Sequence, residues 1–319
     1  MNKIDVKAKQ GRVAAERAEV LVLGHYEGEP KLRGDAATVD KALDGGLRDV
    51  LKSGEFKGTW NQTVLLHTQG RIPAKRVLLI GLGKKKDARL DTIRQALGTV
   101  AKRVRQAGAR SFSAPLLGPL PQISAVQIAQ AMVEGAILGS YQFTAYRSND
   151  TQGEVKTLDR LTVLAPRAET IRDIQQGIRQ GRASAEATAF VRDLCNHPAN
   201  VMTPSRIAAE ARKIGKEHGV RVKVLEQRDV EKLGMGAFLG VARGSHEPPK
   251  FIILEYRGTG RTGRTGRHAA PTVLVGKTIT FDTGGISLKP AENMEQMKAD
   301  MTGGAEVLAT IRAASRLRL

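Results

Sequence analysis

The sequence is poor in cysteine, aromatic residues and long apolar runs. A single cysteine, Cys195, occurs in 319 residues, which excludes an intramolecular disulfide framework and a cysteine-rich zinc module. One cysteine is typical of a reducing compartment, where disulfides are rare. No run approaches the ~18–20 apolar residues that span a bilayer, and residues 1–20 lack the apolar stretch of a secretory signal. We therefore expect a cytoplasmic protein without a membrane partner.

Acidic residues are also scarce relative to basic ones. The chain has 51 Lys and Arg against 32 Asp and Glu, a formal charge of +19. Such an excess is expected of a nucleic-acid binder. However, aromatic residues make up only 4% of the chain, so stacking platforms for bases are few, and no basic helix shows a base-reading spacing. We interpret most of the charge as solvated surface, with nucleic acid as the less favoured partner.

The first half of the chain alternates short apolar runs with amphipathic segments. This alternation predicts an α/β layer domain over residues 1–166, with a mixed sheet covered by helices. The apolar runs are bounded by glycine or proline and predict strands, whereas apolar residues at 3–4 spacing predict helices. The predicted strands are 20–23, 63–67, 76–83 and 161–164, and the predicted helices are 90–106 and 122–138.

A long helix is predicted over residues 167–194, with Gly177 and Gly181 as weak points. It should stop before Pro198, because a residue preceding proline is disfavoured in a helix. A second domain then covers residues 195–319. Its predicted elements are a helix from Thr203-Pro204 to His218, strands at 222–225, 251–256 and 272–275, a short helix at 230–233 and a helix from Ala305.

Charged residues with metal-binding potential lie close together after the predicted strand 272–275. Lys277, Asp282, Lys289 and Asp300 fall within 24 residues, with glycine pairs at 284–285 and 303–304. Singly, such an Asp is often a turn residue and such a Lys a solvated charge. Ligands of open α/β sheets bind at the carboxyl ends of strands, and carboxylates suit Mg²⁺, Mn²⁺ or, with a nitrogen donor, Zn²⁺. The occurrence of two lysines and two aspartates within one short segment favours a metal site.

The segment VGKTITFDTGGISLKPAENMEQMKADMTGGA closely resembles the leucyl (cytosol) aminopeptidase family, the two-metal hexameric aminopeptidases. Further matching stretches are 193–200, 202–204, 233–237 and 247–258. The resemblance covers residues 190–319 well, whereas the N-terminal half agrees in layout without a specific motif. It implies two α/β domains, each a mixed sheet flanked by helices, joined by the long helix.

The resemblance also implies roles for individual residues. Lys277, Asp282 and Asp300 correspond to metal ligands, with Asp282 bridging two divalent ions, Mn or Zn. Lys289 corresponds to the catalytic lysine that polarises the scissile carbonyl. Met297 corresponds to a residue that lines the pocket for the N-terminal side chain, so Met297, Lys289 and Asp300 would contact substrate. The implied substrates are peptides with a free N-terminus, with a leucine-type preference; the implied assembly is a homohexamer, and the implied base is bicarbonate.

One part of the family pattern is missing. Family members carry further ligands, an Asp and a Glu in an Asp-x-Glu-x-Arg motif whose arginine holds the bicarbonate, beyond the helix that here starts at Ala305. No such motif precedes Leu319. We therefore expect a fragment whose catalytic domain is incomplete and which is nearly or wholly inactive. The alternative is a non-catalytic subunit, either basic and nucleic-acid-binding or an assembly component.

Other motifs are weaker. Residues 81–84, Gly-Leu-Gly-Lys, resemble part of a phosphate loop but lack its full spacing, so they predict a turn at the end of a strand. The six histidines show no His-x3-His pair, which disfavours a histidine-based zinc site. No Gly-x-Ser-x-Gly elbow is present. Cys195 is interpreted as a small buried hydrophobe.

Overall fold

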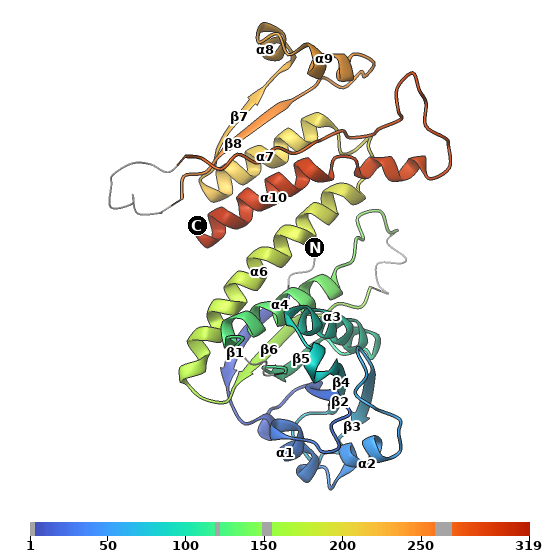
Figure 1. Ribbon diagram of the computed structural model, residues 1–319, viewed down its shortest axis with the longest axis vertical. Coiled ribbons are helices and arrows are strands. Elements are labelled where there is room, and N and C mark those ends of the chain that lie inside the picture. The colour runs from blue at the N-terminus through green and yellow to red at the C-terminus, as the bar shows by residue number, and fades with distance from the viewer. Residues whose placement is uncertain (1–3, 119–121, 149–154, 259–269) are drawn as a thin grey trace. The chain divides into compact units, whose positions relative to one another are not determined.

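The computed structural model describes residues 4–118, 122–148, 155–258 and 270–319. Contacts divide the chain into two compact units, Met1–Glu186 and Ala187–Leu319 (Figure 1). The division falls within one long helix, α6 (Glu169–Asn196). Among the described residues, no helix combines the length and apolar character needed to cross a membrane.

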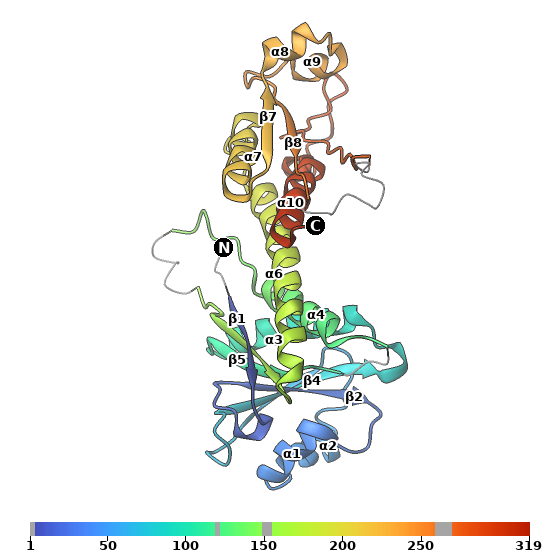
Figure 2. The ribbon, with the colours of Figure 1, turned by 90° about the vertical axis from the view of Figure 1, so that its left-hand side faces the viewer.

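The first unit is built on a six-stranded mixed sheet (Figure 2). Its strand order is β1-β6-β5-β2-β4-β3, and every neighbouring pair is parallel except β3 with β4. The α/β fold predicted from the sequence is thereby confirmed. The strands are β1 (Asp5–Gln10), β2 (Leu21–Glu27), β3 (Thr63–His67), β4 (Arg76–Lys84), β5 (Ser111–Pro115) and β6 (Arg160–Ala165).

Helices cover both faces of this sheet. One face packs against α3 (Leu90–Gln106), α4 (Ala125–Ser140) and the first half of α6. The other packs against α1 (Gly34–Ala42), α2 (Gly46–Lys52) and the short helix η1 (Val13–Ala15). Strand β4 is apolar without alternation because Leu78 and Ile80 enter the first core while Val77 and Leu79 enter the second.

Two strands escaped prediction. β1 reads DVKAKQ and β5 reads SFSAP, so neither is a continuous apolar run. β1 is an edge strand with polar exposed positions, and its pairing to β6 is set by the tertiary fold. The prediction for β3 agrees with the structure at both ends, and so does the prediction for α3.

The glycines of α6, predicted as weak points from their low helix propensity, are sites of close packing against α4. The helix runs unbroken through both. A Cβ at Gly177 would lie 2.3 Å from the Val126 carbonyl oxygen, and one at Gly181 would lie 2.6 Å from that of Gln130. Only glycine lets α6 approach α4 this closely. The helix propensity lost at these positions is offset by the close contact of the two helices.

The second unit contains α7 (Pro204–His218), β7 (Arg221–Leu225), α8 (Gln227–Lys232), α9 (Gly236–Ala242), β8 (Phe251–Glu255), η3 (Met294–Ala299) and α10 (Thr302–Leu317). The predicted cap of α7 is confirmed, since the Thr203 hydroxyl accepts a hydrogen bond from the Arg206 N–H at 3.3 Å. The hydrophobic core of the second unit joins Leu194 of α6, Ile207 and Ile214 of α7, and Leu308 of α10.

The predicted strand 272–275 is not formed, and the sheet of the second unit is not mixed. In the described residues this sheet has two strands only, β7 and β8, which are antiparallel. Residues 272–275 are instead exposed, with Val273 at 75% and Val275 at 91% of their full accessibility. A strand requires a hydrogen-bonded neighbour, and no described residue pairs with this segment. The apolar composition of the segment was therefore a misleading signal.

Candidate metal centre

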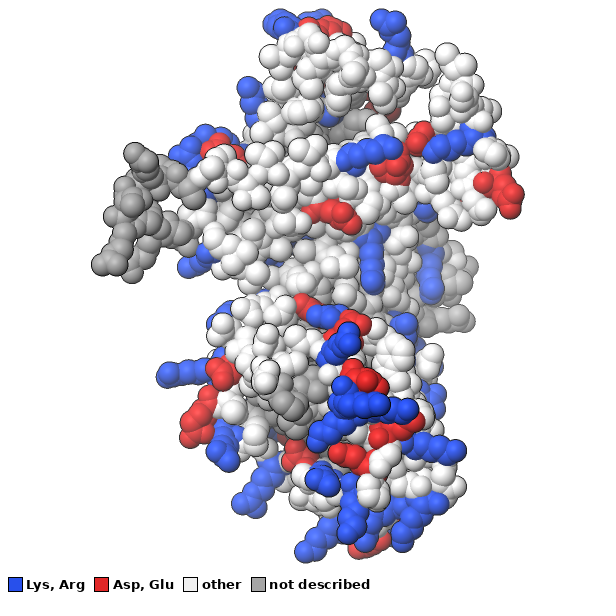
Figure 3. Space-filling view, in the orientation of Figure 1, with Lys and Arg blue, Asp and Glu red and all other residues white. Residues whose placement is uncertain are grey.

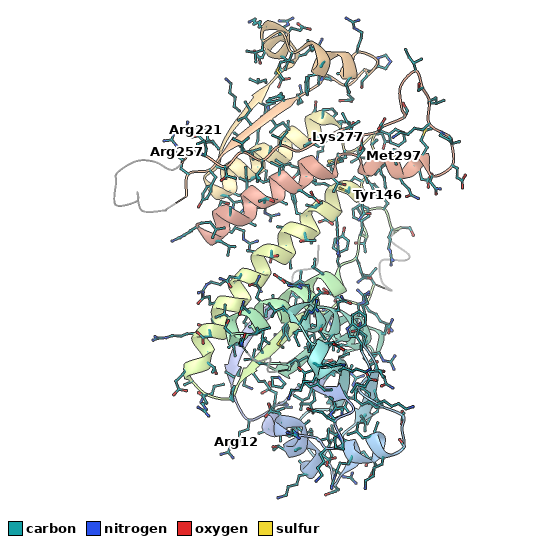
Figure 4. The ribbon with its side chains drawn as sticks, in the orientation of Figure 1. Arg12, Tyr146, Arg221, Arg257, Lys277 and Met297 are labelled. Carbon is teal, nitrogen blue, oxygen red and sulfur yellow. The ribbon has the colours of Figure 1, made fainter. Side chains whose placement is uncertain are left out.

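The start of α10 positions the segment that carries Lys277. The Gly304 N–H donates a hydrogen bond to the Lys277 carbonyl oxygen at 2.8 Å. The Gly276 backbone also lies against Gly303, because a Cβ on Gly276 would come within 2.3 Å of the Gly303 carbonyl oxygen. These backbone contacts hold Lys277 beside the residues that precede α10. Figure 4 labels Lys277 and Met297 in this region.

Lys277 and Asp300 form the first of two lysine–aspartate pairs. Lys277 Nζ lies 2.8 Å from Asp300 Oδ2. That carboxylate oxygen is buried, and no described residue completes a well-oriented hydrogen bond to it. The contact with Asp300 raises the pKa of Lys277, and the negative charge of Asp282 acts in the same direction. The ammonium form of Lys277 is thus stabilised.

Lys289 and Asp282 form the second pair. Lys289 Nζ donates to Asp282 Oδ2 at 2.7 Å and lies 3.1 Å from Met297 Sδ. The Gly284 N–H donates to the other carboxylate oxygen at 2.9 Å. The hydrogen bond from Lys289 lowers the pKa of Asp282, and the Gly284 N–H and the charges of Lys289 and Lys277 add to this. Asp282 is therefore held as the carboxylate.

The turn between Asp282 and Lys289 depends on glycine. Gly284 has φ +94° and Gly285 has φ +84°, a left-handed region that other residues rarely adopt. The Lys289 N–H donates to the Thr283 carbonyl oxygen at 2.9 Å, which closes the turn. The turn brings the side chain of Lys289 back onto Asp282.

The structure thus places the five predicted site residues in two groups, Lys277 with Asp300 and Lys289 with Asp282 and Met297. It also adds anchors that the sequence did not indicate. Lys298 Nζ donates to the Asn196 carbonyl oxygen at 3.2 Å. Cys195 Sγ lies 3.3 Å from Thr302 Oγ1, so Cys195 makes a polar contact and is only partly buried. These anchors join positions about 100 residues apart, a relation that local sequence patterns do not carry.

The donor set suits a divalent cation in part. Two carboxylates and one amine are ligands that Mn²⁺ or Zn²⁺ accepts. Among the described residues, the buried Asp300 oxygen has the ion-pair contact with Lys277 but no well-oriented hydrogen bond. Within the described ranges, however, no group of three or more His, Cys, Asp or Glu residues could hold a metal ion. The described residues therefore offer part of a metal site.

The chain matches both domains of one family. Residues 20–150 match the N-terminal domain of the cytosol aminopeptidase family, and residues 189–319 match its catalytic domain. A probable cytosol aminopeptidase of Alkaliphilus metalliredigens (strain QYMF) is 40% identical, over 94% of this chain and 59% of the relative. That of Geobacter sp. (strain M21) is 42% identical, over 94% and 58%. The chain belongs to the cytosol aminopeptidase family, and it spans about three fifths of the length of these relatives.

Solved structures show the same fold. A mutant of tomato leucine aminopeptidase superposes with a TM-score of 0.83 at 27% identity, over 100% of this chain and 60% of that one. The bottromycin maturation enzyme BotP in complex with Mn superposes with a TM-score of 0.73 at 30% identity, over 94% and 56%. The similarity includes both units of the chain.

Proposed function

We propose that this chain forms the N-terminal domain and the first part of the catalytic domain of a metal-dependent aminopeptidase. The observation that carries the proposal is the pairing of Lys277 with Asp300 and of Lys289 with Asp282, in a chain of the cytosol aminopeptidase family. Relatives named cytosol aminopeptidase support the reaction class.

Each residue of the two pairs has a distinct role in this proposal. Asp282, Asp300 and the neutral amine of Lys277 would hold two divalent ions, which when bound would activate a water and polarise the peptide carbonyl. Lys289 remains charged and stabilises the negative charge that develops on the carbonyl oxygen. Met297, whose sulfur lies 3.1 Å from Lys289 Nζ, would line the pocket for the N-terminal side chain, and Asp300 would lie near the substrate's amino group.

Finer properties extend the proposal. The solved complex of BotP with Mn favours manganese, with zinc as the alternative, and the tomato leucine aminopeptidase favours a leucine-type preference. Bicarbonate as the base, a homohexameric assembly and a cytoplasmic location belong to the same proposal. Peptides with a free N-terminus are the proposed substrates, because a metal-bound α-amino group restricts cleavage to the end of a peptide.

We further propose that residues 1–319 are inactive by themselves. Two carboxylates and one amine cannot complete the shells of two ions, since zinc alone is usually four-coordinate. The additional ligands would come from sequence of the kind that the longer relatives possess. Membership of the family therefore does not require that residues 1–319 are active.

The test compares residues 1–319 with a chain extended to the relatives' length, using a leucyl anilide and Mn²⁺. We expect hydrolysis by the extended chain alone. Lys289→Ala should lower its kcat by about 10²–10³-fold, as removal of an oxyanion stabiliser does, and Lys223→Ala, a change at an exposed residue of β7, should not. Robust release by residues 1–319 would contradict their inactivity, and an inactive but folded extended chain would exclude an aminopeptidase of this specificity.

A further inference from the structure

Trp60, the single tryptophan of the chain, is 55% exposed on the first unit. Its backbone position is fixed, because the turn that carries it pairs with the end of β4. The Gly81 N–H donates to the Gln62 carbonyl oxygen at 2.8 Å, the Asn61 N–H donates to that of Gly81 at 3.0 Å, and the Gly83 N–H donates to that of Gly58 at 3.0 Å. The indole therefore projects from a rigid base.

Gly81 and Gly83 of β4 allow the turn at residues 58–62 to pack closely against the strand. A Cβ at Gly81 would lie 2.0 Å from the Thr59 carbonyl oxygen. At Gly83, where φ is +66°, a Cβ would lie 3.4 Å from Trp60 Cβ. The space beside Gly81 is thus filled by the backbone of residues 58–59. Residues 81–84 lie within β4, so the turn predicted for them at the end of a strand is not formed there. Trp60 thus lies against Gly83, which directly precedes the lysines 84–86.

Exposed lysines extend from both paired segments. Lys57 directly precedes Gly58, and Lys84, Lys85 and Lys86 directly follow Gly83. Within the described part of the chain, Lys57, Lys84 and Lys86 have no carboxylate within ion-pair distance. Lys85 lies 3.8 Å from Glu29 and 5.8 Å from the Tyr26 ring centroid. We call Trp60 with these four lysines the Trp60 surface.

We propose that the Trp60 surface binds single-stranded nucleic acid. An exposed aromatic ring held on a rigid base offers a stacking platform for a base, and nearby lysines without carboxylate partners offer contacts to the flanking phosphates. Lys85 forms an ion pair with Glu29, so three lysines remain to contact phosphate groups. Binding of this kind is indifferent to base sequence, because every base has a π-face.

Other partners fit the Trp60 surface less well. A membrane anchor requires a larger buried apolar area, and Tyr146 is the only other exposed large apolar residue in the described part of the first unit. A protein interface is depleted in lysine at its centre, whereas the two paired segments beside Trp60 carry four exposed lysines. On the face that Figure 3 shows, Lys and Arg are intermingled with Asp and Glu.

Intrinsic fluorescence tests the proposal, because Trp60 is the sole tryptophan and needs no label. Titration of residues 1–319 with an oligothymidylate at low salt should give saturable quenching. Three phosphate contacts predict a slope of log Kobs against log[salt] of about −2. In anisotropy measurements with a labelled oligonucleotide, Trp60→Ala should weaken binding about five- to 150-fold, while Trp60→Phe should retain most of it.

Charge variants separate a defined site from diffuse attraction. Lys84→Glu with Lys86→Glu should weaken binding and flatten the salt dependence. The matched control, Lys102→Glu with Arg103→Glu, reverses two exposed charges of α3 and should have a smaller effect. Equal effects of the two pairs, or unchanged binding by a folded Trp60→Ala chain, would overturn the proposal. Quenching by phosphatidylserine vesicles without quenching by the oligonucleotide would also overturn it, in favour of a membrane surface.

Discussion

At the scale of single residues, the candidate metal centre is two ion pairs that stabilise one another. Asp282 carries a lowered pKa and Lys277 a raised one, and the charge of each contributes to the shift of the other. A lysine ligates a metal only as the neutral amine. In the proposed site the proton on Lys277 would therefore compete with a metal ion, and the pairing with Asp300 would favour the proton.

The first prediction follows from this competition. Because the pKa of Lys277 is raised, metal binding must displace its proton, and the affinity for Mn²⁺ should increase as the pH rises from 6 to 9. Calorimetry of the extended chain, in two buffers with different ionisation enthalpies, should show about one proton more released than in the Lys277→Met variant. Equal proton release by both chains would show that Lys277 does not ligate the metal.

The second prediction concerns His25, which is buried in the first unit. Burial lowers its pKa, although the Glu29 carbonyl and charge partly offset this. The unfolded state therefore takes up the proton first, so His25 should reduce the free energy of unfolding as the pH falls below about 6.5. Urea denaturation between pH 7.5 and 5 should show a flatter pH dependence for His25→Gln. The exposed His67→Gln serves as control, and an unchanged slope for His25→Gln would contradict the prediction.

At the scale of helices and strands, packing between helices can outweigh local helix propensity. Gly177 and Gly181 disfavour a helix by propensity, yet α6 continues through both because α4 lies against them. The Thr203-Pro204 start of α7 was predictable because its capping chemistry is local. The segment 272–275 was not, because strand formation requires a partner that only the fold supplies.

The third prediction tests the packing of α6. Gly177→Ala gains about 0.8–1 kcal/mol of helix propensity, but its Cβ would lie 2.3 Å from the Val126 oxygen. We expect a net loss of about 1–3 kcal/mol, as overpacking typically costs. Gly46→Ala in α2, where the nearest atom to the Cβ is 3.9 Å away, should be neutral or stabilising. Chemical denaturation measures both, and a stabilised Gly177→Ala chain would disprove the close contact.

At the scale of the whole molecule, exposed apolar surface is distributed unequally between the two units. The described residues of the first unit expose Trp60 and Tyr146, whereas the second exposes many large apolar side chains. These are Val201, Leu233, Val241, Phe251, Ile253, Val273, Leu274, Val275, Phe281, Ile286, Leu288 and Leu319. A large amount of exposed apolar surface favours binding of apolar molecules, so the second unit should bind apolar probes.

The fourth prediction locates this surface. Replacing Val273 and Val275 together by threonine should reduce the fluorescence of bound anilinonaphthalene sulfonate. It should change the free energy of unfolding by less than about 0.5 kcal/mol per site, because both residues are exposed. Val163→Thr, at a buried residue of β6, should instead destabilise the first unit. Unchanged dye binding by the double variant would show that the segment is covered in solution.

Local sequence patterns are sufficient to predict the elements whose signals lie within a few residues. These are the apolar strands β3 and β4, the amphipathic helix α3, the capped start of α7 and the residues of the candidate metal centre within one segment. Contacts between distant segments fix the edge strand β1, the close contact of α6 with α4 and the exposure of 272–275 and of Trp60. The physical reason is that pairing, close approach and exposure depend on neighbours distant in sequence, whereas capping and periodicity depend on residues a few positions apart.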